Sequence, residues 1–264
     1  MKKSQTEFYC PDELKNVPLE MGIDEAGRGP VLGPMLYCAA FAKLNYEWPS
    51  SVNDSKQLTS DKRASILKKL EQLPVGFVVK SISAAEISAI CLSRGQTSLN
   101  TISFQACQEL VQRAIDEGLD IKTLYVDTVG KEESYQSLLE RRFPKIKITV
   151  AAKGDSKFKC VGAASIHAKV RRDKEMEDFT FEEPNIKCDR NFGSGYPGDA
   201  VTKQWLEKNF DPVFGYPSIV RFSWNTVSMA FEQKNATALF EAPERKTVDS
   251  AFFVTRNLRS ASFE

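Results

Sequence analysis

Hydrophobic and polar positions follow two different periods along this chain, and the change of period separates predicted strands from predicted helices. Apolar runs at 17–23 and 35–42 flank a glycine-rich polar segment, and a third run covers 75–82. A short apolar stretch at 121–126 ends at an acidic residue, and apolar residues alternate with lysine and threonine over 146–150. The last pattern is typical of a strand with one solvated face at a sheet edge. The chain therefore predicts five strands.

Helical spacing appears in six other segments. The clearest is 98–117, where residues such as Leu99, Ile102 and Ala106 recur at i, i+3 and i+4, and Gly118 ends it. Ser60 is the predicted cap of the first helix. The remaining helices are predicted over 59–73, 132–142, 159–179, 199–210 and 222–234.

The order of these elements predicts an α/β fold, with a mixed five-stranded sheet flanked by helices and a C-terminal helical extension. No linker interrupts 17–234, so we expect one domain over 15–234. Residues 235–264 show no committed pattern and are predicted to be a tail that is partly disordered or docks a partner.

Composition narrows the class of protein. Hydrophobic residues make up 42% of the 264 residues, and no apolar run reaches the ~20 residues of a membrane span, so we expect no membrane segment. The N-terminus lacks the apolar core of a signal peptide. The six cysteines are scattered without a C-x-x-C pair, which favours reduced thiols over disulfides or zinc. The net charge of +1 is low for a nucleic-acid binder, although lysine and arginine cluster locally.

The single histidine limits the possible chemistry. His167 lies in a helix-like stretch, where a packed or surface histidine is expected more often than a catalytic one. A serine or cysteine triad would have to use it, and a zinc site would lack histidine pairs. Acid–base chemistry therefore falls to carboxylates, lysines or metal-bound water.

The segment 21–30 concentrates the candidate chemistry. Asp24 and Glu25 end the first apolar run, and Gly27, Arg28 and Gly29 follow. Adjacent carboxylates repel each other unless a cation lies between them, glycines allow close approach of the backbone, and arginine suits a phosphate. A metal beside a phosphodiester is a nuclease-like arrangement. A charged loop capped by glycines explains the decapeptide equally well.

Two further carboxylates also lie at the end of a strand-like run. Asp127 follows 121–126, and Asp155 follows 146–150. Strand ends collect ligands in α/β sheets, and Mg²⁺ prefers carboxylate oxygens. Four carboxylates can hold two metals ~4 Å apart around a phosphodiester. Each aspartate taken singly is a cap or turn residue more often than a ligand. Because strand side chains alternate, we expect a turn after Ile23 to break the alternation, or one of Asp24 and Glu25 to serve a second metal.

The chain resembles the type 2 ribonuclease H family, and in particular its eukaryotic catalytic subunits. The resemblance covers most of 17–227 and rests on ordered motifs at 22–34, 54–58, 98–100, 126–130, 163–173, 193–197 and 212–224. It implies a ribonuclease H-like fold and hydrolysis of the RNA strand of RNA–DNA hybrids. It also implies incision 5′ of single ribonucleotides embedded in duplex DNA, leaving 3′-hydroxyl and 5′-phosphate ends, in replication and repair in the nucleus.

The resemblance also assigns roles to residues. Matched by motif, the carboxylates that bind Mg²⁺ or Mn²⁺ in a two-metal mechanism are Asp24, Glu25, Asp127 and Asp155. The residues that contact the ribose 2′-hydroxyl and the adjacent phosphate are Gly27, Arg28 and Gly29. Tyr196 stacks on the following sugar, and the expected phosphate or backbone contacts are Lys56, Asn100 and Lys169.

Physical chemistry supports this assignment beside the resemblance. Only the 2′-hydroxyl distinguishes a ribonucleotide from its DNA neighbours, and a glycine-flanked backbone can approach it closely. A turn tyrosine is the plainer interpretation of Tyr196. The sequence departs from the family pattern at Phe192, Gly198 and Gly154, and Gly154 is expected to loosen Asp155.

Two other functions and two kinds of partner follow from the same residues. Transposase- or resolvase-like nucleases share the carboxylate chemistry but need no 2′-hydroxyl sensor, and a non-catalytic scaffold has no need of repelling carboxylates. Eukaryotic relatives work with two non-catalytic subunits, for which 222–264 is the expected docking region. Residues 246–253 resemble a sliding-clamp motif only weakly, because its glutamine is absent and the aromatic spacing differs.

Overall fold

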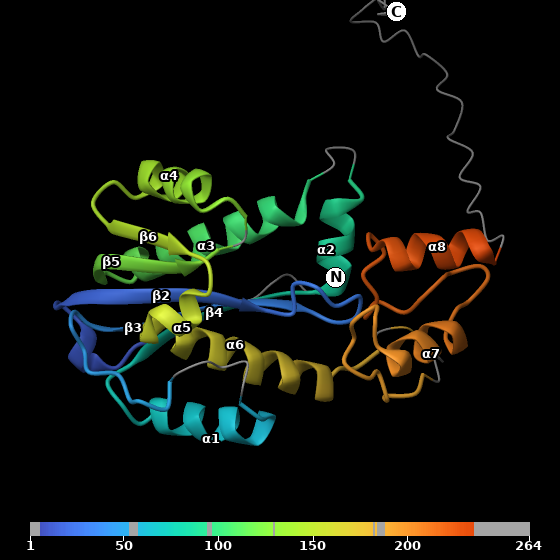
Figure 1. Ribbon diagram of the computed structural model, residues 1–264, viewed down its shortest axis with the longest axis horizontal. Coiled ribbons are helices and arrows are strands. Elements are labelled where there is room, and N and C mark those ends of the chain that lie inside the picture. The colour runs from blue at the N-terminus through green and yellow to red at the C-terminus, as the bar shows by residue number, and fades with distance from the viewer. Residues whose placement is uncertain are drawn as a thin grey trace, which may run out of the picture.

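The computed structural model describes residues 6–52, 58–93, 97–128, 130–181, 183 and 188–234 (Figure 1). The predicted tail at 235–264, the clamp-like segment within it and Lys56 lie outside these residues. Among the helices that the structure does describe, none is long and apolar enough to cross a membrane.

A mixed sheet of six strands, in the order β1-β4-β3-β2-β5-β6, forms the centre of the molecule. The antiparallel part comprises β1 (Thr6–Tyr9), β4 (Gly76–Ile82), β3 (Met35–Lys43) and β2 (Pro18–Ala26). The parallel part adds β5 (Asp120–Asp127) and the edge strand β6 (Lys147–Ala151). All five predicted strands are present, but the count of five is wrong. The sixth strand, β1, has only four residues, too few for its alternation to stand out in the sequence.

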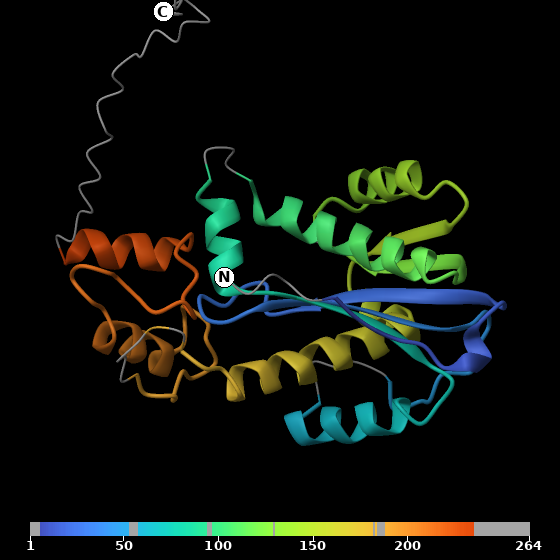
Figure 2. The same cartoon turned by 180° about the vertical axis from the view of Figure 1, so that it is seen from behind.

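Helices cover both faces of the sheet (Figures 1 and 2). One face carries α2 (Ala84–Cys91), α3 (Leu99–Asp116) and α4 (Glu132–Arg142), while the other carries α1 (Ser60–Leu70) and α6 (Lys159–Glu177). A short 3-10 helix, η1, covers Asp12–Leu14, and α5 covers Gly154–Lys157. The six predicted helices are confirmed, whereas α2 and α5 were not predicted. The predicted cap is also wrong by one residue, because the Thr59 hydroxyl, not Ser60, accepts from the Lys62 amide.

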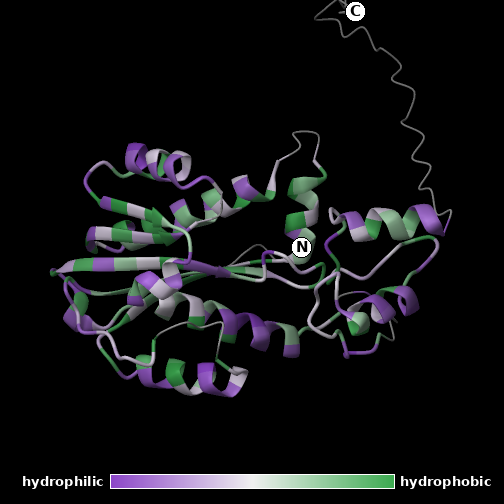
Figure 3. Cartoon of the chain, in the orientation of Figure 1, coloured by the Kyte–Doolittle hydropathy of each residue, from purple (hydrophilic) through white to green (hydrophobic). Residues whose placement is uncertain are grey.

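The C-terminal helices form a separate layer beside the end of the sheet. They are α7 (Ala200–Lys208) and α8 (Asn225–Gln233), and an aromatic cluster packs between them, including a T-shaped Phe192–Trp205 pair. The outer helices carry hydrophobic and hydrophilic residues in turn, as expected where one face is buried (Figure 3). The predicted helical extension is therefore present.

The long helix α6 touches the sheet directly at Gly22. A Cβ atom on Gly22 would lie 2.3 Å from the Val161 nitrogen and 2.4 Å from the Cys160 carbonyl carbon. From Cys160 to Ala168 the helix is mostly buried, and beyond Ala168 it becomes polar. The buried half of α6 therefore packs on the sheet, and its polar half extends past the buried part and is partly exposed to solvent.

The only histidine of the chain, His167, packs between α6 and the sheet. His167 stands edge-on to Phe77, with ring centroids 4.5 Å apart. Burial, followed by the charge of Arg171, lowers the pKa of His167 to about 4. The expectation of a packed histidine is therefore confirmed.

Candidate active site

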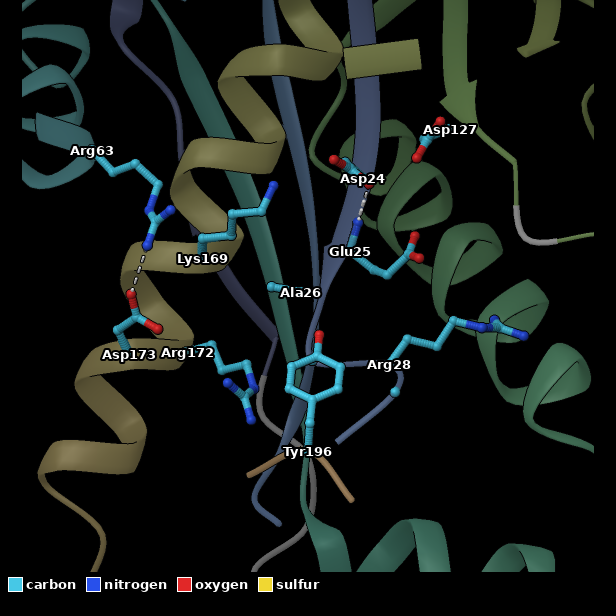
Figure 4. Close-up of a pocket in the computed structure, with 12 residues that line it drawn as sticks. Asp24, Glu25, Ala26, Arg28, Arg63, Asp127, Lys169, Arg172, Asp173 and Tyr196 are labelled. Atoms are coloured by element: carbon cyan, nitrogen blue, oxygen red, sulfur yellow. Dashed lines mark hydrogen bonds and ion pairs between the residues drawn. The ribbon is translucent and has the colours of Figure 1, made fainter. Parts of the chain in front are cut away.

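A pocket of about 250 Å³ opens where β2 and β5 end, between α6 and the loop that carries Tyr196 (Figure 4). Its lining residues are Asp24, Glu25, Ala26, Gly27, Arg28, Gly29, Arg63, Asp127, Lys169, Arg172, Asp173 and Tyr196. Most of the residues singled out from the sequence therefore surround one cavity, although they come from segments far apart in the chain.

The two neighbouring carboxylates lie on a regular strand. Asp24 pairs with Cys38 and Glu25 with Tyr37 in β3, so the first alternative, a turn after Ile23, is wrong. The second, that one of the two carboxylates serves a second metal, stays a prediction. Pairing between β2 and β5, however, stops at Ile23. Beyond Ile23, β2 therefore has no strand paired on its β5 side, and both Asp24 and Glu25 line the pocket there. In Figure 4, Asp24 and Glu25 leave the strand in opposite directions.

Burial and neighbouring carboxylates raise the pKa values of Asp24 and Glu25. Burial is the main cause that raises the pKa of Asp24 to about 7, and the charge of Asp127 adds to it, while a hydrogen bond with the Ser165 hydroxyl opposes the rise. Burial and then the charges of Asp24 and Asp127 raise the pKa of Glu25 to about 8. The Glu25 amide donates to Asp24 Oδ1 at 2.7 Å. Three carboxylates so close together favour a bound proton or a cation.

Asp127 and Asp155 meet through the short helix α5. The Gly154 amide donates to Asp127 Oδ1 at 2.7 Å, and a Cβ on Gly154 would lie 3.2 Å from the Asp127 Cα. Glycine therefore permits a close approach at a position where we expected it to loosen Asp155. Asp155 itself is 1% exposed and does not line the pocket. The structure thus gathers three of the four predicted carboxylates around the cavity and places Asp155 behind Asp127.

The Gly-Arg-Gly segment approaches its neighbours closely. Gly27 has a φ of +80°, and a Cβ there would lie 2.2 Å from Nε of Arg172. Arg28 points toward α3, where it donates to Ser103 Oγ at 2.5 Å and to the side-chain oxygen of Asn100 (Figure 4). Asn100 does not line the pocket, so the structure places it as a partner of Arg28.

Tyr196 closes the pocket opposite the carboxylates. Its ring is 49% exposed, and a Cβ on Gly29 would lie 3.0 Å from Tyr196 Cε1. The hydroxyl points into the pocket, toward the end of β2 (Figure 4). An exposed ring packed on glycine is able to receive the flat face of a ligand.

The remaining wall is basic and was only partly predicted. Lys169 and Arg172 project from α6, and Arg63 projects from α1 and pairs with Asp173 at 3.3 Å. Only Lys169 was predicted. The lysine and arginine clusters in the sequence contain the others, but each cluster is equally typical of a solvated helix face.

A buried arginine holds the Gly-Arg-Gly loop from behind. Arg221 is fully buried and donates to the carbonyl oxygens of Gly27 at 2.5 Å, Arg28 at 3.0 Å, and both Gly33 and Pro34 at 2.8 Å. Trp224 lies under its guanidinium and donates to the Gly29 carbonyl at 3.0 Å. Burial lowers the pKa of Arg221 to about 9. Sequence reasoning missed this residue because its partners are backbone atoms.

Residues 21–227 match the family Ribonuclease HII. The chain belongs to the ribonuclease HII family. It is 42% identical over 232 residues to a ribonuclease H2 subunit of Mus musculus, and the match covers 86% of this chain and 77% of the relative. The corresponding Arabidopsis thaliana protein is 40% identical, and its match covers 98% of this chain and 88% of the relative.

Solved structures of the ribonuclease HII family share the fold. The crystal structure of ribonuclease H2 from Pyrococcus horikoshii superposes with a TM-score of 0.68 at 30% identity, covering 83% of this chain and 100% of that one. The structure of the PCNA:RNase HII complex from Archaeoglobus fulgidus gives 0.62 at 26% identity, with 78% and 95% covered. The predicted ribonuclease H-like α/β fold and the resemblance to eukaryotic catalytic subunits are confirmed.

Membership of the ribonuclease HII family fixes the class of reaction. The chain is a hydrolase, an endonuclease of the type 2 ribonuclease H class, with ribonuclease H activity on RNA–DNA hybrids. The transposase-like and scaffold interpretations are thereby set aside. The roles of individual residues in this ribonuclease HII rest on the geometry above and stay predictions.

Proposed function

We propose that this pocket hydrolyses the RNA strand of RNA–DNA hybrids with a divalent metal and also incises 5′ of single ribonucleotides in duplex DNA. The products would carry 3′-hydroxyl and 5′-phosphate ends. One observation carries the proposal: Asp24, Glu25 and Asp127 share a cavity with a glycine loop and an exposed tyrosine. The carboxylates suit metal-assisted cleavage of a phosphodiester, and the loop and ring suit recognition of a sugar.

The donor set fits Mg²⁺ or Mn²⁺. Asp24, Glu25 and Asp127 supply hard oxygen ligands. Burial and neighbouring carboxylates raise the pKa values of Asp24 and Glu25, and a bound cation would favour their charged forms. Among the described residues no three acidic, histidine or cysteine side chains form a ready-made metal cluster. Mg²⁺ commonly takes one or two protein carboxylates and completes its shell with water and substrate phosphate. When bound, the metal ions would activate water and steady the leaving oxygen.

The other residues of the chain would orient the substrate. Gly27 and Gly29 expose backbone to the 2′-hydroxyl, and Tyr196 would stack on the following sugar. Arg28, Lys169 and Lys56 would contact phosphates, with Asn100 holding Arg28 in place. We assign Asp155 to the catalytic carboxylates through its position next to Asp127.

We also propose partners and a location. The curated relatives are named as one subunit of ribonuclease H2, which supports joining with further subunits, and two non-catalytic subunits would dock on 222–264. A solved archaeal relative forms a complex with PCNA, which supports a weaker proposal that residues 246–253 bind a sliding clamp. Action on RNA–DNA duplexes and embedded ribonucleotides in replication and repair would place the protein in the nucleus.

The direct test uses three duplexes with Mg²⁺: an RNA–DNA hybrid, a DNA duplex with one ribonucleotide, and the same duplex in all-DNA form. Partner subunits are added in a parallel set. We expect incision of the first two, with cleavage 5′ of the ribonucleotide and a 3′-hydroxyl end that a polymerase can extend. Incision of the all-DNA duplex, or of none of the three, would overturn the proposal. Cleavage of the hybrid alone would overturn its single-ribonucleotide part.

A further inference from the structure

Tyr196 sits in a loop that has little regular structure of its own. The loop joins Phe192 to α7 and contains Gly193 and Gly195 with φ values of +63° and +76°. Glycine adopts such angles readily but also leaves the free chain many other conformations. An aromatic ring that reads a sugar must nevertheless stay in one place. Some other part of the protein must therefore hold the loop.

The carboxylate of Asp199 fills the centre of this loop. Its Oδ2 accepts from the Ser194 amide at 2.7 Å and from the Ser194 hydroxyl at 3.0 Å. Its Oδ1 caps α7 by accepting from the Val201 amide at 3.3 Å. A Cβ on Gly193 would lie 2.2 Å from Oδ2, so the backbone wraps tightly around the carboxylate. These hydrogen bonds, led by that from the Ser194 amide, lower the pKa of Asp199 to about 2.

Thr202 links Asp199 to Gly195, which contacts the segment after the Gly-Arg-Gly loop. Its hydroxyl is fully buried, accepts from the Gly195 amide at 3.0 Å, and lies 2.8 Å from the Phe192 carbonyl and 3.0 Å from Asp199 Oδ2. The Gly195 carbonyl in turn accepts from the Val31 amide at 2.8 Å. A continuous set of hydrogen bonds therefore runs from Asp199 to the segment that follows the Gly-Arg-Gly loop.

We propose that Asp199 and Thr202 are positioning residues that hold Tyr196 against Gly29 and so set the rate of incision. The inference rests on the proposed function, because it assigns how the sugar-reading side of the same pocket is preorganised. Asp199 and Thr202 do not line the pocket, so any effect they have on the substrate passes through the loop that they hold. Their loss would change the placement of a reading group while leaving the carboxylates in place.

The test compares Asp199→Ala and Asp199→Asn with the unchanged protein on the duplex that carries one ribonucleotide. A misplacement of about 1 Å costs up to about a hundredfold in rate. We expect kcat to fall about tenfold to a hundredfold in Asp199→Ala, and KM to change less than about twofold because the phosphate contacts persist. Thr202→Val should behave in the same way, while Thr202→Ser keeps the hydroxyl and should restore most of the rate.

A double-mutant cycle separates positioning from a general loss of structure. In a Tyr196→Ala background, Asp199→Ala should cause almost no further loss, because the group that it positions is gone. Ser83→Ala is the matched control: it removes an equivalent helix cap, at α2, and should leave kcat unchanged. Hydrogen exchange of residues 192–199 should speed up in Asp199→Ala and stay unchanged in Ser83→Ala.

Two results would overturn the positioning role. One is an unchanged kcat in both Asp199 variants, and the other is a full, additive loss in the Tyr196→Ala background. If the unchanged protein fails to cut the ribonucleotide duplex, the proposed function itself is wrong, and the two failures are thus distinguishable. If Asp199→Ala does not fold, Asp199→Asn and the Thr202 pair carry the same comparison.

Discussion

The carboxylate side of the pocket and its loop side are held by different interactions. Asp24, Glu25 and Asp127 lie at the ends of paired strands, where the backbone ladder of the sheet sets their positions. The glycine loop and the Tyr196 loop have no such ladder and are held by side chains, Arg221 and Trp224 for the first and Asp199 and Thr202 for the second. A reaction centre built on strands tolerates change elsewhere, whereas a recognition centre built on loops depends on remote residues.

The largest effect should come from the strand side. Asp127→Asn keeps the size of the side chain but removes its charge, so it should lower kcat at least about a thousandfold while duplex binding stays near normal. Single-turnover cleavage and a binding titration measure the two quantities. Asp120→Asn, at the other end of β5, is the matched control and should cut normally. An active Asp127→Asn protein would remove Asp127 from the site.

The next effect tests the loop side through its buried support. Arg221→Met fills similar space but removes a donor from four carbonyl oxygens, of which that of Pro34 keeps another, from Arg172, so we expect a loss of about 3 kcal/mol in the free energy of unfolding. Urea denaturation measures it. Arg190→Met, which removes an exposed guanidinium that donates to two carbonyls, should cost far less. Equal losses in the two variants would contradict a special role for the buried arginine.

A smaller effect is expected from the loop residue itself. Arg28→Ala removes a charge beside the scissile region, and we expect a fall of about tenfold to a hundredfold in kcat/KM and a weaker salt dependence of binding. Arg28→Lys keeps the charge but not both hydrogen bonds to Ser103 and Asn100. Its kcat/KM should therefore lie between those of the unchanged protein and Arg28→Ala. Arg28→Ala with unchanged salt dependence would exclude a phosphate contact.

The smallest effect is a pH dependence of stability in the metal-free protein. The folded pKa values of Asp24 and Glu25, about 7 and about 8, lie above their ordinary values of 3.8 and 4.5. The folded state therefore holds more protons than the unfolded state, and stability should fall as the pH rises from about 4 to about 8. Thermal melts in a chelator measure this fall. Glu25→Gln should flatten the curve, and a melting temperature that rises over this range would contradict the assignment.

The sequence predicts the carboxylate side of the pocket better than the residues that support its loop side. Asp24, Glu25 and Asp127 are found because each follows an apolar run, and a strand end is a local feature. Arg221 lies in the motif at 212–224, but that motif does not tell which atoms it contacts, and they are backbone atoms 187 to 194 positions away. Arg63 was missed for a similar reason, since its place in the pocket depends on how α1 packs on α6.

The errors in the predicted fold have equally specific causes. β1 and α5 are four residues each, shorter than the window in which a period can be recognised. The expected turn after Ile23 was wrong because β2 continues as a regular strand to Ala26, paired with β3. Its pairing with β5 ends at Ile23, and both carboxylates line the pocket beyond that point.

Gly22 sets the spacing between the two walls of the pocket. The missing side chain lets α6 rest on the backbone of β2, and α6 carries the Lys169 and Arg172 of the basic wall while β2 carries Asp24 and Glu25 of the acidic wall. A Cβ atom at position 22 would meet the backbone of Cys160 and Val161, so α6 and its basic side chains would have to move away from β2. An enzyme of this kind can keep every reacting group and still lose its activity through spacing alone.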